Sequence, residues 1–426
     1  MKILLTGASG FIGRNLVTAL LYAGHSVVCA VRTPPASPSH PNISYVRIDF
    51  NNAITPGAWS VALDGVDVVV NTVGILRESP TRTFDLIHRA APTALFSAAA
   101  EAGVKHIVQI SALGADENAR SGYHLSKKAA DEFLLRLPLR ASVVQPSLVY
   151  GPGGASAALF ELFASSPLTM LPGGGRQLIQ PVHIDDLVQA LHALIESTQG
   201  GSRRIAMVGP TPITLRDFYS TLRNAMGIKR RAHFLAVPMP VMRLIARVGS
   251  RLPGGFLDID TLDMLERGNT APPDEINSLL GRLPRPASQF VPPAYARPAG
   301  IQARSRWLLP ILRVSIGLVW LGTGVVSLGI YPVESSYALL ARTGMPEPLM
   351  PLFLYGAAAL DIALGILTLL PKRSRWLWAG QAALVLGYTV IISWKLPEFW
   401  LHPYGPVLKN LPFLAALWIL YELDER

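Results

Sequence analysis

The chain has 426 residues, of which 50% are hydrophobic and only 15% are charged. This length exceeds one ordinary domain, and the composition excludes a disordered chain and argues against a purely soluble protein. The net charge of +10 fits either nucleic-acid binding or basic flanks that hold membrane segments on the cytoplasmic side, and the low charge density favours the second interpretation. The single cysteine, Cys29, excludes an intramolecular disulfide and suits a reducing compartment.

The first 230 residues alternate short β-branched runs with segments of helical composition. The predicted strands are Ile3–Leu5, Val27–Val31, Tyr45–Ile48, Val66–Asn71, His106–Ser111 and Ala141–Gln145. Segments between them, such as Ile12–Ala23 and Arg82–Gly103, are predicted helices. This alternation predicts an α/β architecture over residues 1–230, a Rossmann-type doubly wound parallel sheet with helices on both faces.

A glycine-rich turn, Gly7-x-x-Gly10-x-x-Gly13, joins the first predicted strand to the first predicted helix. Glycines at this spacing permit a tight turn, let the backbone approach a pyrophosphate and let the helix pack closely on the strand. Free N–H groups at the helix start then face the negative phosphates. The residues expected to bind the cofactor here are Gly7, Ser9, Gly10, Phe11, Ile12, Gly13 and Arg14.

The second predicted strand ends at Arg32, where an NAD site would carry an acidic residue for the ribose 2′-hydroxyl. Arg32 instead offers a cation and a fork of donors to a 2′-phosphate, and Arg14 could contribute a second cation. Both arginines favour NADP(H) over NAD(H), whereas the alternative for Arg32 is a solvated strand end. Asp49, after the third strand, is a candidate partner of the adenine amino group.

Ser111 ends the fifth predicted strand, and Tyr123 and Lys127 follow at i and i+4 of a helix, so that they share a face. A nearby ammonium favours the phenolate and lowers the pKa of a tyrosine from its usual value of about 10. The phenol can then exchange a proton with a carbonyl or alcohol while hydride moves to or from nicotinamide, and Ser111 can hydrogen-bond the same oxygen. We therefore expect these three residues to be catalytic; the alternative is a surface Tyr/Lys pair.

Two other kinds of site are not predicted. The sequence contains no Cys/His cluster of metal-binding spacing and no aromatic-basic pattern typical of nucleic-acid binding. Residues 231–281 are assigned to a substrate subdomain with an amphipathic helix over Pro238–Leu252, which suits either an anionic membrane surface or a lid on the substrate pocket. Five prolines between residues 282 and 306 predict an extended linker.

Long apolar segments predict an all-α transmembrane four-helix bundle over residues 307–426. The predicted spans are Trp307–Tyr331, Leu349–Pro371, Trp376–Trp394 and Val407–Leu423. The first three reach the roughly 20 residues that cross hydrocarbon, with a buried helical domain as the alternative, and the fourth is shorter. Asp361 lies near the centre of the second span, where a carboxylate could relay protons, bind a polar head group or form a protonated packing contact.

Basic residues set the predicted orientation. They concentrate before the first span and between the second and third, at Arg304, Arg306, Arg313, Lys372, Arg373 and Arg375. Because positive loops stay inside, we expect a multi-pass protein of the inner (cytoplasmic) membrane with both termini and the nucleotide-binding domain in the cytoplasm.

Two further motifs, Gln145–Gly153 and Pro181–Leu187, complete a family resemblance. Together with the glycine turn and the catalytic candidates, they make residues 1–280 resemble the extended and atypical short-chain dehydrogenases/reductases. The similarity is greatest to the group that contains the NAD(P)H-binding accessory subunit of respiratory complex I. Residues 307–426 resemble the DoxX-like four-helix membrane proteins through Ala359–Gly365 and Gly405–Pro412.

The resemblance implies further contacts to the cofactor. Lys127 would touch the nicotinamide ribose, and Pro146 and Ser147 would flank the nicotinamide. Thr72 is a further candidate contact, in the segment Asn71–Gly74 that departs from the family's common Asn-Ala-Ala.

These features predict a membrane-anchored NADP(H)-dependent oxidoreductase of the short-chain type that interconverts a carbonyl and an alcohol. The four expected spans exceed what simple tethering needs and favour a hydrophobic or membrane-derived substrate. One alternative is a non-catalytic NADPH-binding subunit, structural or sensing, of a membrane complex. Another is a nucleotide-sugar epimerase or dehydratase, which would typically retain NAD, and Arg32 argues against it.

Overall fold

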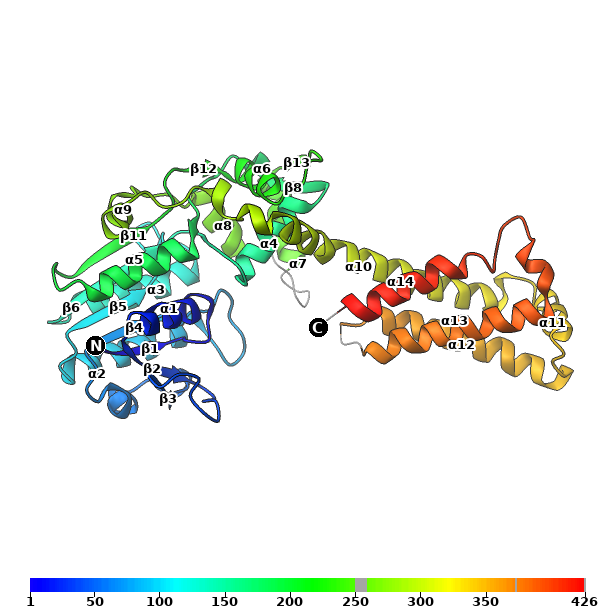
Figure 1. Ribbon diagram of the computed structural model, residues 1–426, viewed down its shortest axis with the longest axis horizontal. Coiled ribbons are helices and arrows are strands. Elements are labelled where there is room, and N and C mark those ends of the chain that lie inside the picture. Colours follow the sequence, from blue (N-terminus) through cyan, green and yellow to red (C-terminus); the bar gives the residue numbers. More distant parts are fainter. Residues whose placement is uncertain (250–258, 372–373, 425–426) are drawn as a thin grey trace. The chain divides into compact units, whose positions relative to one another are not determined.

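A computed structural model describes residues 1–249, 259–371 and 374–424 (Figure 1). The chain forms two compact units, Met1–Ala303 and Arg304–Arg426. The first unit is built on a parallel β-sheet, and the second consists of helices.

The sheet of the first unit has, within the described residues, seven parallel strands in the order β11-β6-β5-β4-β1-β2-β3. They are β1 (Lys2–Thr6), β2 (Ser26–Val31), β3 (Ile43–Arg47), β4 (Val68–Asn71), β5 (His106–Ile110), β6 (Arg140–Pro146) and β11 (Arg203–Met207). The first six coincide with the predicted strands. The pattern does not predict β11, because it opens with two exposed arginines at the sheet edge and carries no long apolar run.

Helices cover both faces of this sheet (Figure 1). One face packs against α1 (Phe11–Tyr22), α5 (Ile184–Glu196) and α9 (Asp274–Leu280). The other packs against the 3-10 helix η1 (Pro56–Leu63), the π-helical turn η2 (Asp85–Ala90), α2 (Ala91–Glu101) and α3 (Gly122–Leu135). Both faces are buried, which accounts for the apolar runs in the interior strands, and the prediction of a doubly wound α/β fold is confirmed.

A smaller part of the first unit surrounds a third core, which includes Phe218 and Phe290. Its helices are α4 (Ala155–Ser165), α6 (Leu215–Ala225), α7 (Met239–Gly249) and α8 (Ile259–Arg267), and a 3-10 turn, η3 (Gly173–Gly175), adjoins them. Its strands form the pairs β7 (Val149–Tyr150) with β10 (Val182–His183), β8 (Leu168–Pro172) with β13 (His233–Val237), and β9 (Leu178–Ile179) with β12 (Ile213–Thr214). This subdomain therefore begins well before residue 231, where the sequence pattern places its start. The amphipathic helix is present as α7, and the end of its predicted range, including Arg251, lies outside the described residues.

The proline-rich segment packs on the first unit and is not an extended linker. After α9, Arg282 and Arg285 both contact the buried carboxylate of Asp186, with Arg282 Nη2 donating to Oδ1 at 2.6 Å. The ring of Phe290 stacks on Tyr150 at 5.0 Å between centroids. The prolines shape two short 3-10 turns, η4 (Ala287–Gln289) and η5 (Pro293–Tyr295), and the chain is helical again from Ala296.

The second unit contains, among the described residues, three helical stretches long and apolar enough to cross a membrane. They are Pro293–Ile330, Glu347–Leu369 and Arg375–Lys395. The corresponding elements are α10 (Ala296–Val325) with η6 (Val326–Ile330), η7 (Glu347–Leu349) with α12 (Met350–Leu369), and α13 (Arg375–Lys395). They agree with the first three predicted spans. The second and third stretches begin within a few residues of the prediction, whereas the first begins earlier than predicted.

The fourth predicted span is a helix of only 14 residues, α14 (Asn410–Leu423). This is shorter than the roughly 20 residues that cross hydrocarbon, so the structure supports three long spans and one short apolar helix. The unit also contains α11 (Val333–Arg342) and the 3-10 turn η8 (Pro397–Trp400), which the apolar pattern does not predict.

Polar side chains are buried within the second unit. The indole Nε1 of Trp320 donates to Gln381 Oε1 at 2.7 Å, and Gln381 Nε2 donates to Thr368 Oγ1 at 2.9 Å. Asp361 is half-buried beside Thr323, and its Oδ1 has no hydrogen-bond partner among the described residues. A polar group inside an apolar bundle is costly without a partner, so Asp361 remains a candidate functional residue.

Candidate active site

The glycine turn closes tightly at the carboxyl end of β1. Gly7 has a φ of +75°, and the N–H of Gly10 donates to the carbonyl of Gly7 at 2.8 Å. A Cβ on Gly13 would lie 2.2 Å from that carbonyl oxygen, so only glycine lets α1 approach β1 this closely. In this described segment no side chain caps the first turn of α1, which leaves its N–H groups available to a phosphate. The turn therefore fits the pyrophosphate of a dinucleotide.

Thr72 packs against the same turn from the end of β4. Its Oγ1 donates to the carbonyl of Thr6 at 2.8 Å, and a Cβ on Gly7 would lie 2.6 Å from that hydroxyl. Thr72 therefore helps to fix the turn, and its hydroxyl proton is already used by the β1 backbone.

The two arginines expected near the 2′-phosphate have different surroundings. Arg14 Nη2 donates to the carbonyl of Gly153 at 2.8 Å, and its guanidinium lies over the ring of Phe11 at 5.5 Å. Arg32 follows β2, is exposed, and has no hydrogen-bond or ion-pair partner in the described parts of the chain. Arg32 is therefore available to an anion, whereas Arg14 ties the start of α1 to the loop after β7.

The remaining cofactor candidates lie at the ends of β3 and β6. Asp49 Oδ1 accepts the N–H of Asn51 at 3.0 Å, so this carboxylate closes a local turn. Pro146 is the last residue of β6, and its carbonyl accepts the N–H of Leu113, which places it beside the loop after β5. Ser147 is buried, and its Oγ donates to the carbonyl of Gln180 at 2.5 Å.

Helix α3 carries the chemical candidates on one face. Tyr123, Lys127 and Asp131 lie at i, i+4 and i+8, and Ser121 caps the helix by accepting the N–H of His124. Lys127 and Asp131 are both buried. Since side chains four apart share a face, this face of α3 points at the carboxyl ends of β4 and β5.

Lys127 is held by backbone carbonyls from two strand ends. Its Nζ donates to the carbonyl of Ile110 at 3.0 Å and to that of Val73 at 3.1 Å. Burial lowers the pKa of Lys127 to about 8, and the carboxylate of Asp131 opposes that shift. The ammonium is thus partly neutralised near physiological pH.

Asp131 is a site residue that the sequence analysis misses. The hydroxyl of Ser111 donates to Asp131 Oδ2, and Oδ1 has no hydrogen-bond partner among the described residues. Burial raises the pKa of Asp131 to about 7, against the opposing effects of Ser111 and Lys127. The sequence feature that could have indicated Asp131 is its position, because an acidic residue four residues after Lys127 lies on the same face of the helix.

Tyr123 lies against two aromatic rings, with His88 edge-on at 5.3 Å and Phe84 edge-on at 5.9 Å between centroids. Burial, followed by the charge of Asp131, raises the pKa of Tyr123 to about 12. The sequence pattern predicts the opposite direction. The difference arises because desolvation and a nearby carboxylate, which the pattern does not reveal, outweigh the ammonium four residues away.

His88 is a second residue of the candidate site that the sequence pattern does not predict. The one sequence feature that points to it is its position in a predicted helix. Its Nε2 accepts the N–H of Ile75 at 2.9 Å, and its Nδ1 lies 2.9 Å from Ser126 Oγ. Burial and the charge of Lys127 lower the pKa of His88 to about 2, so the ring is neutral. His88 therefore supports Tyr123 by packing and does not carry charge.

The candidates Ser111, Tyr123 and Lys127 thus gather at one edge of the sheet, with Asp131 beneath them. At neutral pH the phenol of Tyr123 is protonated, which makes it a proton donor. The glycine turn lies at the same edge, because the strands are parallel and their carboxyl ends coincide. This combination can bind a dinucleotide and deliver a proton to an oxygen beside it.

Comparison with known proteins finds a similarity for each unit. Residues 3–209 match the NAD dependent epimerase/dehydratase family, and residues 317–418 match the DoxX-like family. A ceramide reductase from Caulobacter vibrioides is 29% identical over 229 residues, which cover 53% of this chain and 71% of that protein.

Two further similarities concern the first unit. A mitochondrial subunit of NADH dehydrogenase [ubiquinone], alpha subcomplex subunit 9 of Arabidopsis thaliana, is 26% identical over 56% of this chain, a match that spans 61% of the subunit's own length. The crystal structure of a nucleoside-diphosphate-sugar epimerase from Staphylococcus aureus covers 68% of this chain and 99% of its own, with a TM-score of 0.56 and 19% identity. The structural likeness establishes the fold of the first unit.

Proposed function

Because this chain joins a domain of the NAD dependent epimerase/dehydratase family to a DoxX-like domain, we propose that it is a membrane-anchored NADP(H)-dependent reductase of carbonyl compounds. The observation that carries the proposal is the grouping of partly exposed Tyr123 with buried Ser111 and Lys127 at the sheet edge that also holds the glycine turn. A nicotinamide cofactor follows from the family, and the preference for NADP(H) is part of the proposal.

The residues present fit such a cofactor. Gly7, Gly10 and Gly13 keep the turn tight, because a Cβ on any of them would press on neighbouring atoms of the protein, and the backbone of this turn would hold the pyrophosphate. Exposed Arg32 would bind the 2′-phosphate, and Lys127 would hold the nicotinamide ribose. Once bound, the nicotinamide would supply or accept hydride.

The protonation states favour reduction of a carbonyl. Because the pKa of Tyr123 lies at about 12, its phenol holds its proton at neutral pH and can give it to an oxygen that becomes an alcohol. Ser111 donates to Asp131 in the absence of substrate, so it can orient that oxygen only when its hydrogen bond is redirected. Protonation of Asp131, whose pKa lies at about 7, would reverse the bond and release the serine hydroxyl.

The proposed substrate is a hydrophobic molecule taken from the bilayer. Two facts support this: the similarity to a ceramide reductase and the attachment of the first unit to three long apolar helices. From the distribution of basic residues, we further propose that the first unit faces the cytoplasm from the inner membrane.

The test uses the full chain purified in detergent, with NADPH and a panel of ceramides, long-chain ketones and long-chain aldehydes. NADPH oxidation should appear with at least one member, and Tyr123→Phe should abolish it while NADPH still binds. Tyr22→Phe is the matched control, because Tyr22 is 90% exposed at the end of α1. Undiminished turnover in Tyr123→Phe would refute the assigned role.

A second candidate function is a non-catalytic NADPH-binding subunit of a membrane complex. The similarity to a respiratory complex subunit favours it. Tight NADPH retention without turnover on the whole panel, together with co-purification of partner subunits, would support this function. The epimerase alternative rests on the family name, and epimerisation of a nucleotide sugar with NAD would reveal it.

A further inference from the structure

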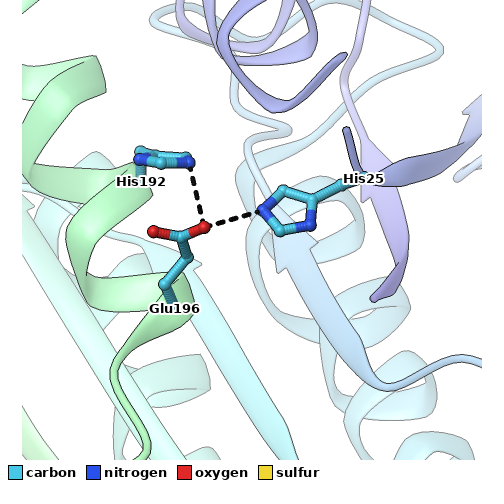
Figure 2. Close-up of side chains that lie close together, drawn as sticks. All are labelled: His25, His192 and Glu196. Atoms are coloured by element: carbon cyan, nitrogen blue, oxygen red, sulfur yellow. Dashed lines mark ion pairs between the residues drawn. The ribbon is translucent and has the colours of Figure 1, made fainter. Parts of the chain in front are cut away.

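Three potential metal ligands converge at the opposite edge of the first unit's sheet. Figure 2 shows His25, from the turn before β2, facing His192 and Glu196 of α5. His192 and Glu196 lie at i and i+4, so α5 presents both on one face. The cluster therefore joins the start of a central strand to the end of a helix that covers the sheet.

Two distances within the cluster match those between ligands of one ion. Glu196 Oε1 lies 3.3 Å from His25 Nε2 and 3.5 Å from His192 Nε2, and all three ligand atoms lie within 4.8 Å of one another. Ligands held at 2.0–2.2 Å from a tetrahedral zinc ion lie roughly 3.3–3.5 Å apart. The two distances from Glu196 Oε1 thus equal those between neighbouring corners of such a tetrahedron, and the two imidazole nitrogens lie within 4.8 Å of each other.

The cluster runs from a buried histidine to the surface: the side chains of His192 and Glu196 are 27% and 47% exposed. His25 is only 7% exposed, and neither its Nε2 nor that of His192 has an aligned hydrogen-bond partner among the described residues. Two buried ring nitrogens without a hydrogen bond are costly, and a metal ion would satisfy both at once. His192 also lines a groove of about 500 Å³ between α1 and α5, which gives an ion access from solvent.

We propose that His25, His192 and Glu196 bind a transition-metal ion of the Zn²⁺ class. Two imidazole nitrogens and a carboxylate oxygen are a donor set typical of zinc and unlike the all-oxygen sites of calcium and magnesium. The fourth position is open to water. Sequence spacing does not reveal this site, because His25 joins it from a distant part of the chain.

The role of the ion is structural and separate from the proposed reductase site. Residues Ile184–Glu196 form α5, and with a rise of about 1.5 Å per residue its ends are roughly 18 Å apart. The catalytic candidates gather at the carboxyl ends of the strands, whereas His25 precedes the amino end of β2. The ion would clip the end of α5 to the sheet.

The experiment titrates the untagged full chain, stripped of metal in detergent, with Zn²⁺ in a calorimeter. We expect one ion per chain, a rise in the unfolding temperature on binding, and the visible absorption of tetrahedral cobalt when Co²⁺ is used instead. His192→Ala should weaken Zn²⁺ binding by roughly 100-fold or more, since even changes next to metal ligands cost about 10- to 100-fold.

Matched variants distinguish the site from adventitious binding. His233→Ala removes an exposed histidine on β13 and should leave Zn²⁺ affinity unchanged. NADPH binding and circular dichroism report whether His192→Ala folds, and Glu196→Gln provides a near-isosteric second test. Absence of a one-to-one site in the wild type, or Zn²⁺ affinity equal to that of the wild type in His192→Ala and Glu196→Gln, would overturn the proposal and leave an ion-paired cluster only.

Discussion

Asp131→Asn should shift the pH range over which the protein binds NADPH. Burial lowers the pKa of Lys127 to about 8, and the Asp131 carboxylate is the charge that opposes this shift. The amide is similar in size but neutral, so the pKa of Lys127 should fall further. At pH 7.5 a pKa of about 8 leaves about three quarters of the lysine protonated, and a fall of about one unit, or about 1.4 kcal/mol, would leave about one quarter.

The assay measures NADPH affinity by fluorescence from pH 6 to 9 with the full chain in detergent. If the ammonium of Lys127 holds the cofactor, affinity should decline above about pH 8 in the wild type and about one unit lower in Asp131→Asn. The sign for stability follows from linkage. Folding depresses the pKa of Lys127 from 10.5, so the folded protein has its full stability, with respect to this group, above pH 10.5. That part of the stability is lost as the pH falls through about 8, where the buried lysine becomes charged.

Glu101→Gln is the control for this experiment. It removes one negative charge from an exposed position at the end of α2, away from the buried pair. Its NADPH profile should match that of the wild type. An unchanged midpoint in Asp131→Asn, with normal circular dichroism, would refute the reasoning that Asp131 sets the charge of Lys127.

Three further substitutions have expected outcomes. Arg32→Ala should reduce the ratio of NADPH affinity to NADH affinity by about 10- to 100-fold, because charge-assisted hydrogen bonds contribute about 1.5–3 kcal/mol. The same ratio in the variant and the wild type would reject the 2′-phosphate role. Gly13→Ala should lower the free energy of unfolding, measured by thermal denaturation, by about 1–3 kcal/mol or more and should impair nucleotide binding, because the new Cβ would lie 2.2 Å from a carbonyl oxygen. The control, Gly57→Ala, should be nearly neutral, because its Cβ meets nothing within 4 Å. Asp186→Ala should cost about 2–3 kcal/mol in the same measurement, because it leaves the donors of Arg282 and Arg285 without their buried acceptor, and a shift below 0.5 kcal/mol would contradict this.

Much of the first unit's fold follows from local patterns. The strands from β1 to β6 are β-branched runs bounded by polar residues, and the constraints on Gly7 and Gly13 act within a single turn. Such features depend on neighbours in the sequence, which is why spacing alone predicts them. The edge strand β11 escapes prediction because its solvent-facing arginines remove the apolar signal.

The chemistry of the site is less predictable, because it depends on burial between distant segments. The spacing of Tyr123 and Lys127 places them on one helix face, but the raised pKa of Tyr123 depends on desolvation by Phe84 and His88 and on the charge of Asp131. The predicted linker is wrong for the same reason: proline composition indicates an extended chain, whereas the contacts of Arg282, Arg285 and Phe290 with distant segments show that the segment is packed.

The packing of residues 282–303 on the first unit has a practical consequence for any attempt to separate this unit from the apolar helices that follow. Truncation near residue 281 would strip Phe290 from Tyr150 and Phe218, uncovering an aromatic hollow that invites aggregation. It would also remove both guanidinium partners of Asp186. A fragment that keeps the first unit intact therefore extends through Ala303, into the helix that continues as the first apolar stretch.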